Sequence, residues 1–169
     1  MAYIYYVSGG QRSGKSSYAQ RLALELSPKP IYLATSRIWD KDHQQRIERH
    51  QADRNEQWVN IEEEKYISKH NWQGKVVVMD CVTLWLTNFF SDTQYNVNQA
   101  LKEAQQEFDL FTQQDFTGII ISNEIGMGLH ADTEVGRKFT DLQGWMNQYI
   151  AQKANQAVFM VSGMPITIK

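Results

Sequence analysis

Short β-branched apolar runs alternate along the chain with stretches that have helical spacing. The apolar runs cover residues 2–7, 30–34, 75–80, 118–122 and 157–161. Helical spacing of apolar positions covers residues 17–26, 82–90, 96–114 and 135–149. Strands that are apolar throughout and separated by helices are typical of a parallel sheet buried on both faces. The pattern therefore predicts an α/β fold whose mostly parallel sheet is covered by helices on both faces.

Weaker signals complete this pattern. Residues 58–61 and 165–168 predict two further short strands, the second at a sheet edge, and the polar stretch 40–54 predicts a helix with little apolar surface. The chain has only three prolines, and no low-complexity linker or internal repeat separates its elements. We therefore expect residues 1–169 to form a single nucleotide-binding catalytic domain, long enough to bury a core without disulfides.

A glycine-rich loop lies between the first predicted strand and the first predicted helix. Residues 9–16 read GGQRSGKS and fit the phosphate-loop pattern G-x-x-x-x-G-K-S/T. In such a loop the glycines let backbone N–H groups wrap a phosphate closely, and the lysine places a positive charge at the β- and γ-phosphates. The hydroxyl after the lysine is a ligand for Mg²⁺. The loop predicts a nucleoside triphosphate site with Lys15 and Ser16 in these roles.

Polar residues follow the other predicted strands at the edge where ligands of parallel sheets gather. Asp80 ends a Val-rich strand, where a carboxylate either holds Mg²⁺, directly or through water, or caps the next helix. Ala34, Thr35 and Ser36 offer hydroxyls and backbone amides, either to a ligand or to a turn. Residues 122–128 read SNEIGMG, which suits substrate contacts or a flexible strand-to-helix connection.

Four histidines are present, at positions 43, 50, 70 and 130, and a histidine in a polar segment is usually just solvated. His50 differs because helical spacing would bring it onto one face with Arg46 and Arg54. Two cations there would bind polyphosphate oxygens and keep the imidazole neutral. A neutral imidazole beside a triphosphate can attack phosphorus and form a phosphoramidate. The spacing makes His50 a candidate for covalent catalysis.

Composition and charge narrow the expected partners and location. The net charge of −2, without a Lys/Arg cluster, gives no reason to expect nucleic acid. Cys81 is the single cysteine, which excludes an internal disulfide and favours a reducing compartment. The sequence lacks an N-terminal signal pattern and an apolar run near the roughly 20 residues that span a bilayer. We expect a cytoplasmic protein with no transmembrane segment.

Together the motifs resemble one family, the bifunctional adenosylcobinamide kinase / adenosylcobinamide-phosphate guanylyltransferases of cobalamin (vitamin B12) biosynthesis. The resemblance covers essentially the whole chain, in order. It rests on GGQRSGKS at 9–16, YLATS at 32–36, R-I-x-x-H-x-x-x-R at 46–54 with Trp58 and Glu62, DCVTLWLTN at 80–88, SNEIGMG at 122–128 and the C-terminal stretch that begins SGMP at 162. Gln11 and residues 129–131 depart from the family's usual pattern.

This resemblance implies a RecA-like phosphate-loop NTPase fold, a homotrimer and two reactions. ATP or GTP would phosphorylate the hydroxyl of the aminopropanol arm of adenosylcobinamide. GMP would then pass from GTP through His50, as a GMP-histidine intermediate, to that phosphate, giving adenosylcobinamide-GDP and pyrophosphate. Mg²⁺ is expected at Ser16 and Asp80. The nucleotide contacts that carry over are Gly9, Gly10, Gln11, Arg12, Ser13, Gly14, Lys15, Ser16, Ala34, Thr35, Ser36, Gln51, Ala52, Asp53, Arg54, Glu62 and Asp80.

Two other interpretations of the same residues remain open. The first is a small-molecule kinase that uses the phosphate loop without a covalent intermediate. The second is a nucleotide-dependent switch or binding module without its own chemistry, although the chain lacks the N-K-x-D guanine signature of switch GTPases.

Overall fold

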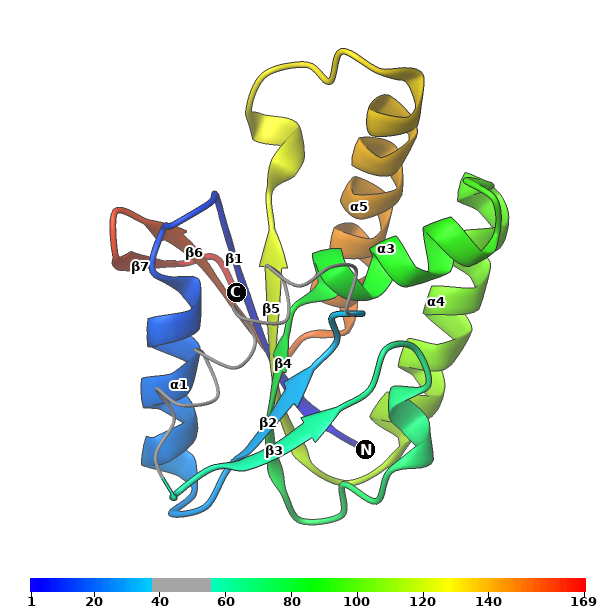
Figure 1. Cartoon of the computed structure of the whole chain (residues 1–169). Coiled ribbons are helices and arrows are strands. Elements are labelled where there is room, and N and C mark those ends of the chain that lie inside the picture. The colour runs from blue at the N-terminus through cyan, green and yellow to red at the C-terminus, as the bar shows by residue number, and fades with distance from the viewer. Residues whose placement is uncertain (38–55) are drawn as a thin grey trace.

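A seven-stranded sheet organises the part of the chain that the computed structural model describes, residues 1–37 and 56–169 (Figure 1). Its order is β3-β2-β4-β5-β1-β6-β7. Every pairing is parallel except that of β6 with β7, so the prediction of a mostly parallel sheet is confirmed. The strands are β1 (Tyr3–Gly9), β2 (Ile31–Ala34), β3 (Val59–Glu62), β4 (Val76–Asp80), β5 (Thr117–Asn123), β6 (Gln156–Val161) and β7 (Met164–Thr167).

The strand that leads into the phosphate loop lies inside the sheet and does not pair with the strand that ends in Asp80. The strand that leads into residues 9–16, β1, lies between β5 and β6. The strand that ends in Asp80, β4, is separated from β1 by β5. The predicted edge strand is confirmed as β7, which pairs antiparallel with β6 at one end of the sheet.

Four helices and two 3-10 turns complete the described residues. Figure 1 shows α1 (Lys15–Leu26) on one face of the sheet and α3 (Val82–Asp92), α4 (Val97–Gln113) and α5 (Glu134–Lys153) on the other. The turns are η1 (Ile67–Lys69) and η2 (Ile125–Met127). The first helix begins two residues before the predicted stretch, because the glycine-rich loop runs directly into it. The helix predicted at 40–54 lies outside the described residues.

Two apolar clusters cover the two faces of the sheet because successive strand residues point to opposite sides. On β4 and β5, Met79 and Ile120 pack toward α3, α4 and α5, whereas Val78 and Ile119 pack toward α1. The larger cluster contains the buried indoles of Trp72 and Trp85, whose N–H groups each donate to a backbone carbonyl, at 2.7 and 2.9 Å. The two clusters therefore bury both faces of the sheet whose edge carries the polar residues.

The amphipathic prediction for the last helix holds for most of its length. Leu142 and Met146 are fully buried, whereas Val135, in the first turn, is 43% exposed. In Figure 1 that end of α5 projects past the sheet, so Val135 lacks a core to pack against. None of the helices in residues 1–37 and 56–169 is long and apolar enough to cross a membrane.

A pair of substitutions on α4 tests this assignment of faces. Phe108 is fully buried, and Phe108→Ala should lower the free energy of unfolding by about 3–5 kcal/mol because it leaves a cavity. Leu110 on the same helix is 51% exposed, and Leu110→Ala should cost less than about 1 kcal/mol. Urea denaturation of both variants measures the difference. Equal losses would contradict the orientation of α4.

Candidate functional site

Residues 9–16 form a tight loop between β1 and α1, with its backbone shaped for an anion. Arg12 (φ 55°) and Gly14 (φ 94°) both have left-handed backbone conformations, and Gly14 is the N-cap of α1. Such alternation turns successive N–H groups toward one point, and the start of a helix adds its partial positive charge. The geometry therefore supports phosphate binding.

The turn between β6 and β7 contacts this loop. Gly163 donates its N–H to Ser13 O at 2.9 Å. A Cβ on Gly14 would lie 3.0 Å from Gly163 Cα, so glycine is required there by close approach as well as by φ. Sequence reasoning did not assign Gly163 a role, although the SGMP motif that contains it was a signal.

Lys15 lies inside the loop and is only 8% exposed. Its Nζ donates to Gly10 O at 2.5 Å and lies 3.5 Å from Ser13 Oγ. Burial lowers the pKa of the ammonium, and the charge of Asp80 partly offsets this. The ammonium thus occupies the space that the loop encloses, where phosphate oxygens could replace its protein acceptors.

Asp80 faces the loop rather than the helix that follows it. Ser16 Oγ donates to Asp80 Oδ2 at 2.9 Å, and the Tyr32 hydroxyl donates to the same oxygen at 2.6 Å. The N-cap of α3 is Cys81, which makes no side-chain cap hydrogen bond. A hydroxyl and a carboxylate in contact are the hard oxygen ligands that Mg²⁺ prefers, so the pair fits that ion. Nothing in the sequence pattern indicated the part played by Tyr32.

Three predicted nucleotide contacts are aligned across neighbouring strands. Ala34 ends β2 and is paired in register with Glu62 on one side and with Asp80 on the other. Parallel pairing places these three strand ends at one edge of the sheet, the edge that also carries the phosphate loop. Glu62, Ala34 and Asp80 are therefore brought together, and their contacts with a nucleotide stay predictions.

Thr35 uses its polar groups within the protein. It is fully buried, and its hydroxyl donates to Cys81 O at 2.8 Å. Asn88 Nδ2 donates to Thr35 O at 2.8 Å and to Glu64 O at 2.9 Å. These bonds join the ends of β2 and β3 to α3, so Thr35 positions the row of strand ends. A direct nucleotide contact by Ala34, Thr35 or Ser36 stays a prediction.

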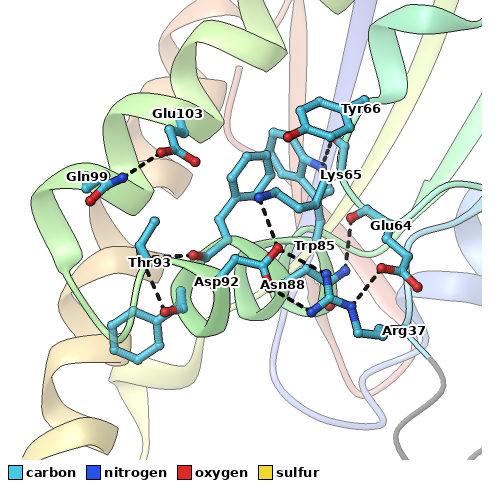
Figure 2. Close-up of polar contacts among 12 residues, drawn as sticks. Arg37, Glu64, Lys65, Tyr66, Trp85, Asn88, Asp92, Thr93, Gln99 and Glu103 are labelled. Carbon is cyan, nitrogen blue, oxygen red and sulfur yellow. Dashed lines mark hydrogen bonds and ion pairs between the residues drawn. The ribbon is translucent and has the colours of Figure 1, made fainter.

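Arg37, which follows β2, forms ion pairs with Glu64 and Asp92 (Figure 2). The guanidinium contacts Asp92 at 2.8 and 3.1 Å and Glu64 at 2.7 Å, while Lys65 Nζ lies 3.1 Å from Asp92. The hydrogen bonds from Arg37, together with those from Lys65, lower the pKa of Asp92 to about 2. The network ties the residues after β2 and β3 to the end of α3. Single exposed ion pairs contribute little, but a bidentate arginine adds geometric definition.

Several predicted residues lie outside the described part of the chain. His50, Arg46, Gln51, Ala52, Asp53 and Arg54 all fall within residues 38–55. Their assignments as covalent intermediate, cations and nucleotide contacts therefore stay predictions.

A pocket of about 670 Å³ lies beside the phosphate loop, between the start of α3 and the segment that follows β5. The predicted SNEIGMG segment forms one wall, where Asn123 Nδ2 donates to Thr83 Oγ1 at 2.9 Å. Cys81 also lines the pocket, where burial raises the pKa of its thiol to about 12 and so disfavours the thiolate. The described lining residues are Gly10, Gln11, Cys81, Thr83, Leu84, Asn123, Glu124, Ile125, Met127 and Gly128.

Comparison with known proteins relates the whole chain to one family. The family described as cobinamide kinase / cobinamide phosphate guanyltransferase matches residues 5–168. The bifunctional adenosylcobalamin biosynthesis protein CobP of Pseudomonas aeruginosa is 33% identical, over 96% of this chain and 95% of that protein. CobU of Escherichia coli, with the same description, is 32% identical, over 96% and 98%. Among solved structures, the flagellar accessory protein FlaH from Methanocaldococcus jannaschii matches 99% of this chain and 78% of that chain, at 13% identity and a TM-score of 0.48.

Two glycine substitutions test the geometry of the loop. Gly14→Ala should weaken nucleoside triphosphate binding at least about tenfold, because a left-handed φ and the Gly163 backbone both oppose a Cβ. Gly144 lies inside α5, and a Cβ added there would meet no atom within 4 Å, so Gly144→Ala should keep binding and raise stability by about 0.5–1 kcal/mol. Equilibrium binding of a fluorescent nucleotide and thermal unfolding measure both effects. Normal binding by Gly14→Ala would contradict the loop geometry.

Proposed function

Because this chain belongs to the cobinamide kinase / cobinamide phosphate guanyltransferase family, and is thus a bifunctional enzyme of adenosylcobalamin biosynthesis, we propose that both reactions use the nucleotide site at Gly9–Ser16. The observation that carries this proposal is the contact of Ser16 with Asp80 beside the buried Lys15. It places a hydroxyl, a carboxylate and an ammonium around one loop shaped for phosphate.

In the kinase step, the loop N–H groups and Lys15 stabilise charge that develops on the γ-phosphoryl group of ATP or GTP. The acceptor is the hydroxyl of the aminopropanol arm of adenosylcobinamide. Ser16 and Asp80 would hold Mg²⁺, which neutralises phosphate charge when it is bound. The Ser16–Asp80 hydrogen bond supports this assignment, because it holds the two oxygens 2.9 Å apart.

In the guanylyl step, His50 attacks the α-phosphorus of GTP and pyrophosphate leaves. Arg46, Arg54 and Lys15 offset the negative charge, and adenosylcobinamide phosphate then takes GMP from His50. The aligned strand ends support the proposed GTP contacts, since they offer a continuous edge beside the loop. These contacts are Gly9–Ser16, Ala34–Ser36, Gln51–Arg54, Glu62 and Asp80.

We further propose a cytoplasmic homotrimer that has no nucleic-acid partner. The edge strand β7 supports association, because Met164 and Ile166 are 63% and 53% exposed there. Exposed apolar side chains on an edge strand favour contact with another chain. The net charge of −2 supports the absence of a nucleic-acid partner.

Replacing His50 separates the proposed function from its alternatives. His50→Ala should abolish the acid-labile adduct that forms from α-labelled GTP, yet leave phosphorylation of adenosylcobinamide by γ-labelled nucleotide measurable. The reason is that only the guanylyl step needs the imidazole as a nucleophile. The matched control is His70→Ala, since His70 Nε2 lies 3.4 Å from Glu63 and outside the loop.

An adduct that still forms in His50→Ala would contradict the assignment of His50 as the nucleophile. A wild-type protein that phosphorylates the corrinoid without any adduct would be a plain kinase. Slow hydrolysis without turnover of any corrinoid would indicate a switch or binding module.

The oligomeric state has its own measurement. Light scattering coupled to size exclusion should give a mass of three chains at micromolar concentration, in the presence and absence of GTP. A single-chain mass under both conditions would rule out the trimer without affecting the proposed chemistry.

A further inference from the structure

The pocket of about 670 Å³ adjoins the place where a γ-phosphate would lie. Gly10 and Gln11 form its wall on the loop side, and Gly10 O accepts the hydrogen bond from Lys15 Nζ. The lysine of a phosphate loop reaches the β- and γ-phosphates. Since that ammonium already contacts a residue of the pocket wall, the pocket opens toward the reacting end of a bound triphosphate.

Glu124 is held firmly at this pocket. Its backbone N–H donates to Gly9 O at 3.1 Å, which ties the segment after β5 to the start of the phosphate loop. Its carboxylate accepts from Asn147 Nδ2 at 3.3 Å. Asn147 in turn accepts from Ser122 Oγ at 2.6 Å and from Gln143 Nε2 at 2.9 Å, and all three side chains are buried. This network orients a carboxylate whose protein partner leaves acceptor capacity for a ligand.

The chemistry of the walls selects a neutral alcohol over an anion. Glu124 is the one carboxylate among the described lining residues, while Leu84, Ile125 and Met127 supply apolar surface. A carboxylate repels a phosphorylated ligand but accepts a hydrogen bond from a hydroxyl. The pocket therefore suits the acceptor of the kinase step and disfavours the phosphorylated acceptor of the guanylyl step.

We propose that this pocket binds the hydroxyl-bearing aliphatic arm of the kinase acceptor and that Glu124 is the catalytic base for its phosphorylation. This inference rests on the proposed function, since it needs a triphosphate on the phosphate loop. The acceptor oxygen forms a bond to the γ-phosphorus, and its proton passes to the Glu124 carboxylate. The bond from the γ-phosphorus to the bridging oxygen breaks, and its electron pair stays on the nucleoside diphosphate. When Glu124 loses that proton to water, its charge repels the new phosphate and favours release.

Glu124→Gln tests the base with little change of shape. Its amide oxygen still accepts from Asn147, but it takes no proton, so kcat for phosphorylation of adenosylcobinamide should fall about 10²–10⁴-fold. The GMP adduct on the enzyme from α-labelled GTP should form within about twofold of the wild-type rate. Glu25→Gln, on the exposed surface of α1, is the matched control and should leave both activities unchanged.

The pH profile gives a second measure that needs no variant. Burial raises the pKa of Glu124, with the Asn147 hydrogen bond opposing it, and the carboxylate must be ionised to accept a proton. Wild-type kcat for the kinase step should therefore fall as pH drops through this raised pKa. Burial raises the pKa of Tyr6 on β1 and of Cys81 across the pocket, which keeps both neutral. On α5, the amide of Asn147 contacts Glu124, while Arg137 and Asp141 line a neighbouring cavity with Gly126 and Gly128. The acid limb should disappear in Glu124→Gln.

A variant at the mouth of the pocket tests where the acceptor binds. Met127 is 71% exposed, so Met127→Trp should fold normally and narrow the opening. It should raise KM for adenosylcobinamide at least about fivefold and leave KM for the nucleotide unchanged. An unchanged KM for the corrinoid would refute the proposed pocket.

The remaining outcomes separate this inference from the proposed function. Kinase activity of Glu124→Gln within about threefold of wild type would overturn the role of Glu124, even with a normal adduct. Loss of both the adduct and the kinase activity in a folded Glu124→Gln protein would also overturn it, because the carboxylate would then act on nucleotide binding. A wild-type protein that forms no adduct contradicts the proposed function, whereas the kinase assay of Glu124→Gln still decides the base.

Discussion

Parallel pairing of β2 and β4, with β5 between β4 and β1, is the constraint on which the site depends. It brings Ser16 and Asp80, 64 residues apart in sequence, to 2.9 Å. Ser16 lies in the first turn of α1 and Asp80 ends β4, so the arrangement of the strands is what brings them together. The apolar clusters on both faces supply the burial that keeps the strands in register.

Several polar groups at the edge of the sheet that carries the phosphate loop form hydrogen bonds within the protein and stabilise the fold. The hydroxyl of Thr35 and the amide of Asn88 are bound to backbone carbonyls, and Ser122, Gln143 and Asn147 bind one another. Buried polar groups of this kind are costly unless they are paired, and paired they define one arrangement. These hydrogen bonds fix the positions of polar side chains near the ends of β2 and β5.

The sequence predicted the strands, the phosphate loop and the closeness of Asp80, because hydrophobic periodicity and a local motif encode them. It did not predict that Tyr32 shares the Asp80 oxygen or that Gly163 packs against Gly14. Both contacts join residues far apart in the chain, and a tyrosine in an apolar strand resembles any core residue. It left the Thr35 hydroxyl open between a ligand and a turn, whereas its partner, the Cys81 carbonyl, is set by tertiary packing.

The two proposed reactions make opposite demands on charge. Transfer to an alcohol needs a group that takes a proton, whereas transfer to a phosphate needs cations that tolerate two anions together. Among the described residues, Glu124 meets the first demand from the pocket between β5 and the start of α3. The cations proposed for the second demand, Arg46 and Arg54, lie outside the described residues, and Lys15 of the loop serves both proposed reactions. The phosphate loop, whose Gly10 and Gln11 line this pocket, can present the γ-phosphorus to Glu124. In the proposed guanylyl step the same loop holds GTP, whose α-phosphorus reacts with His50 instead. Bifunctionality in this fold thus requires only one nucleotide site, provided that the acceptors approach it from different sides.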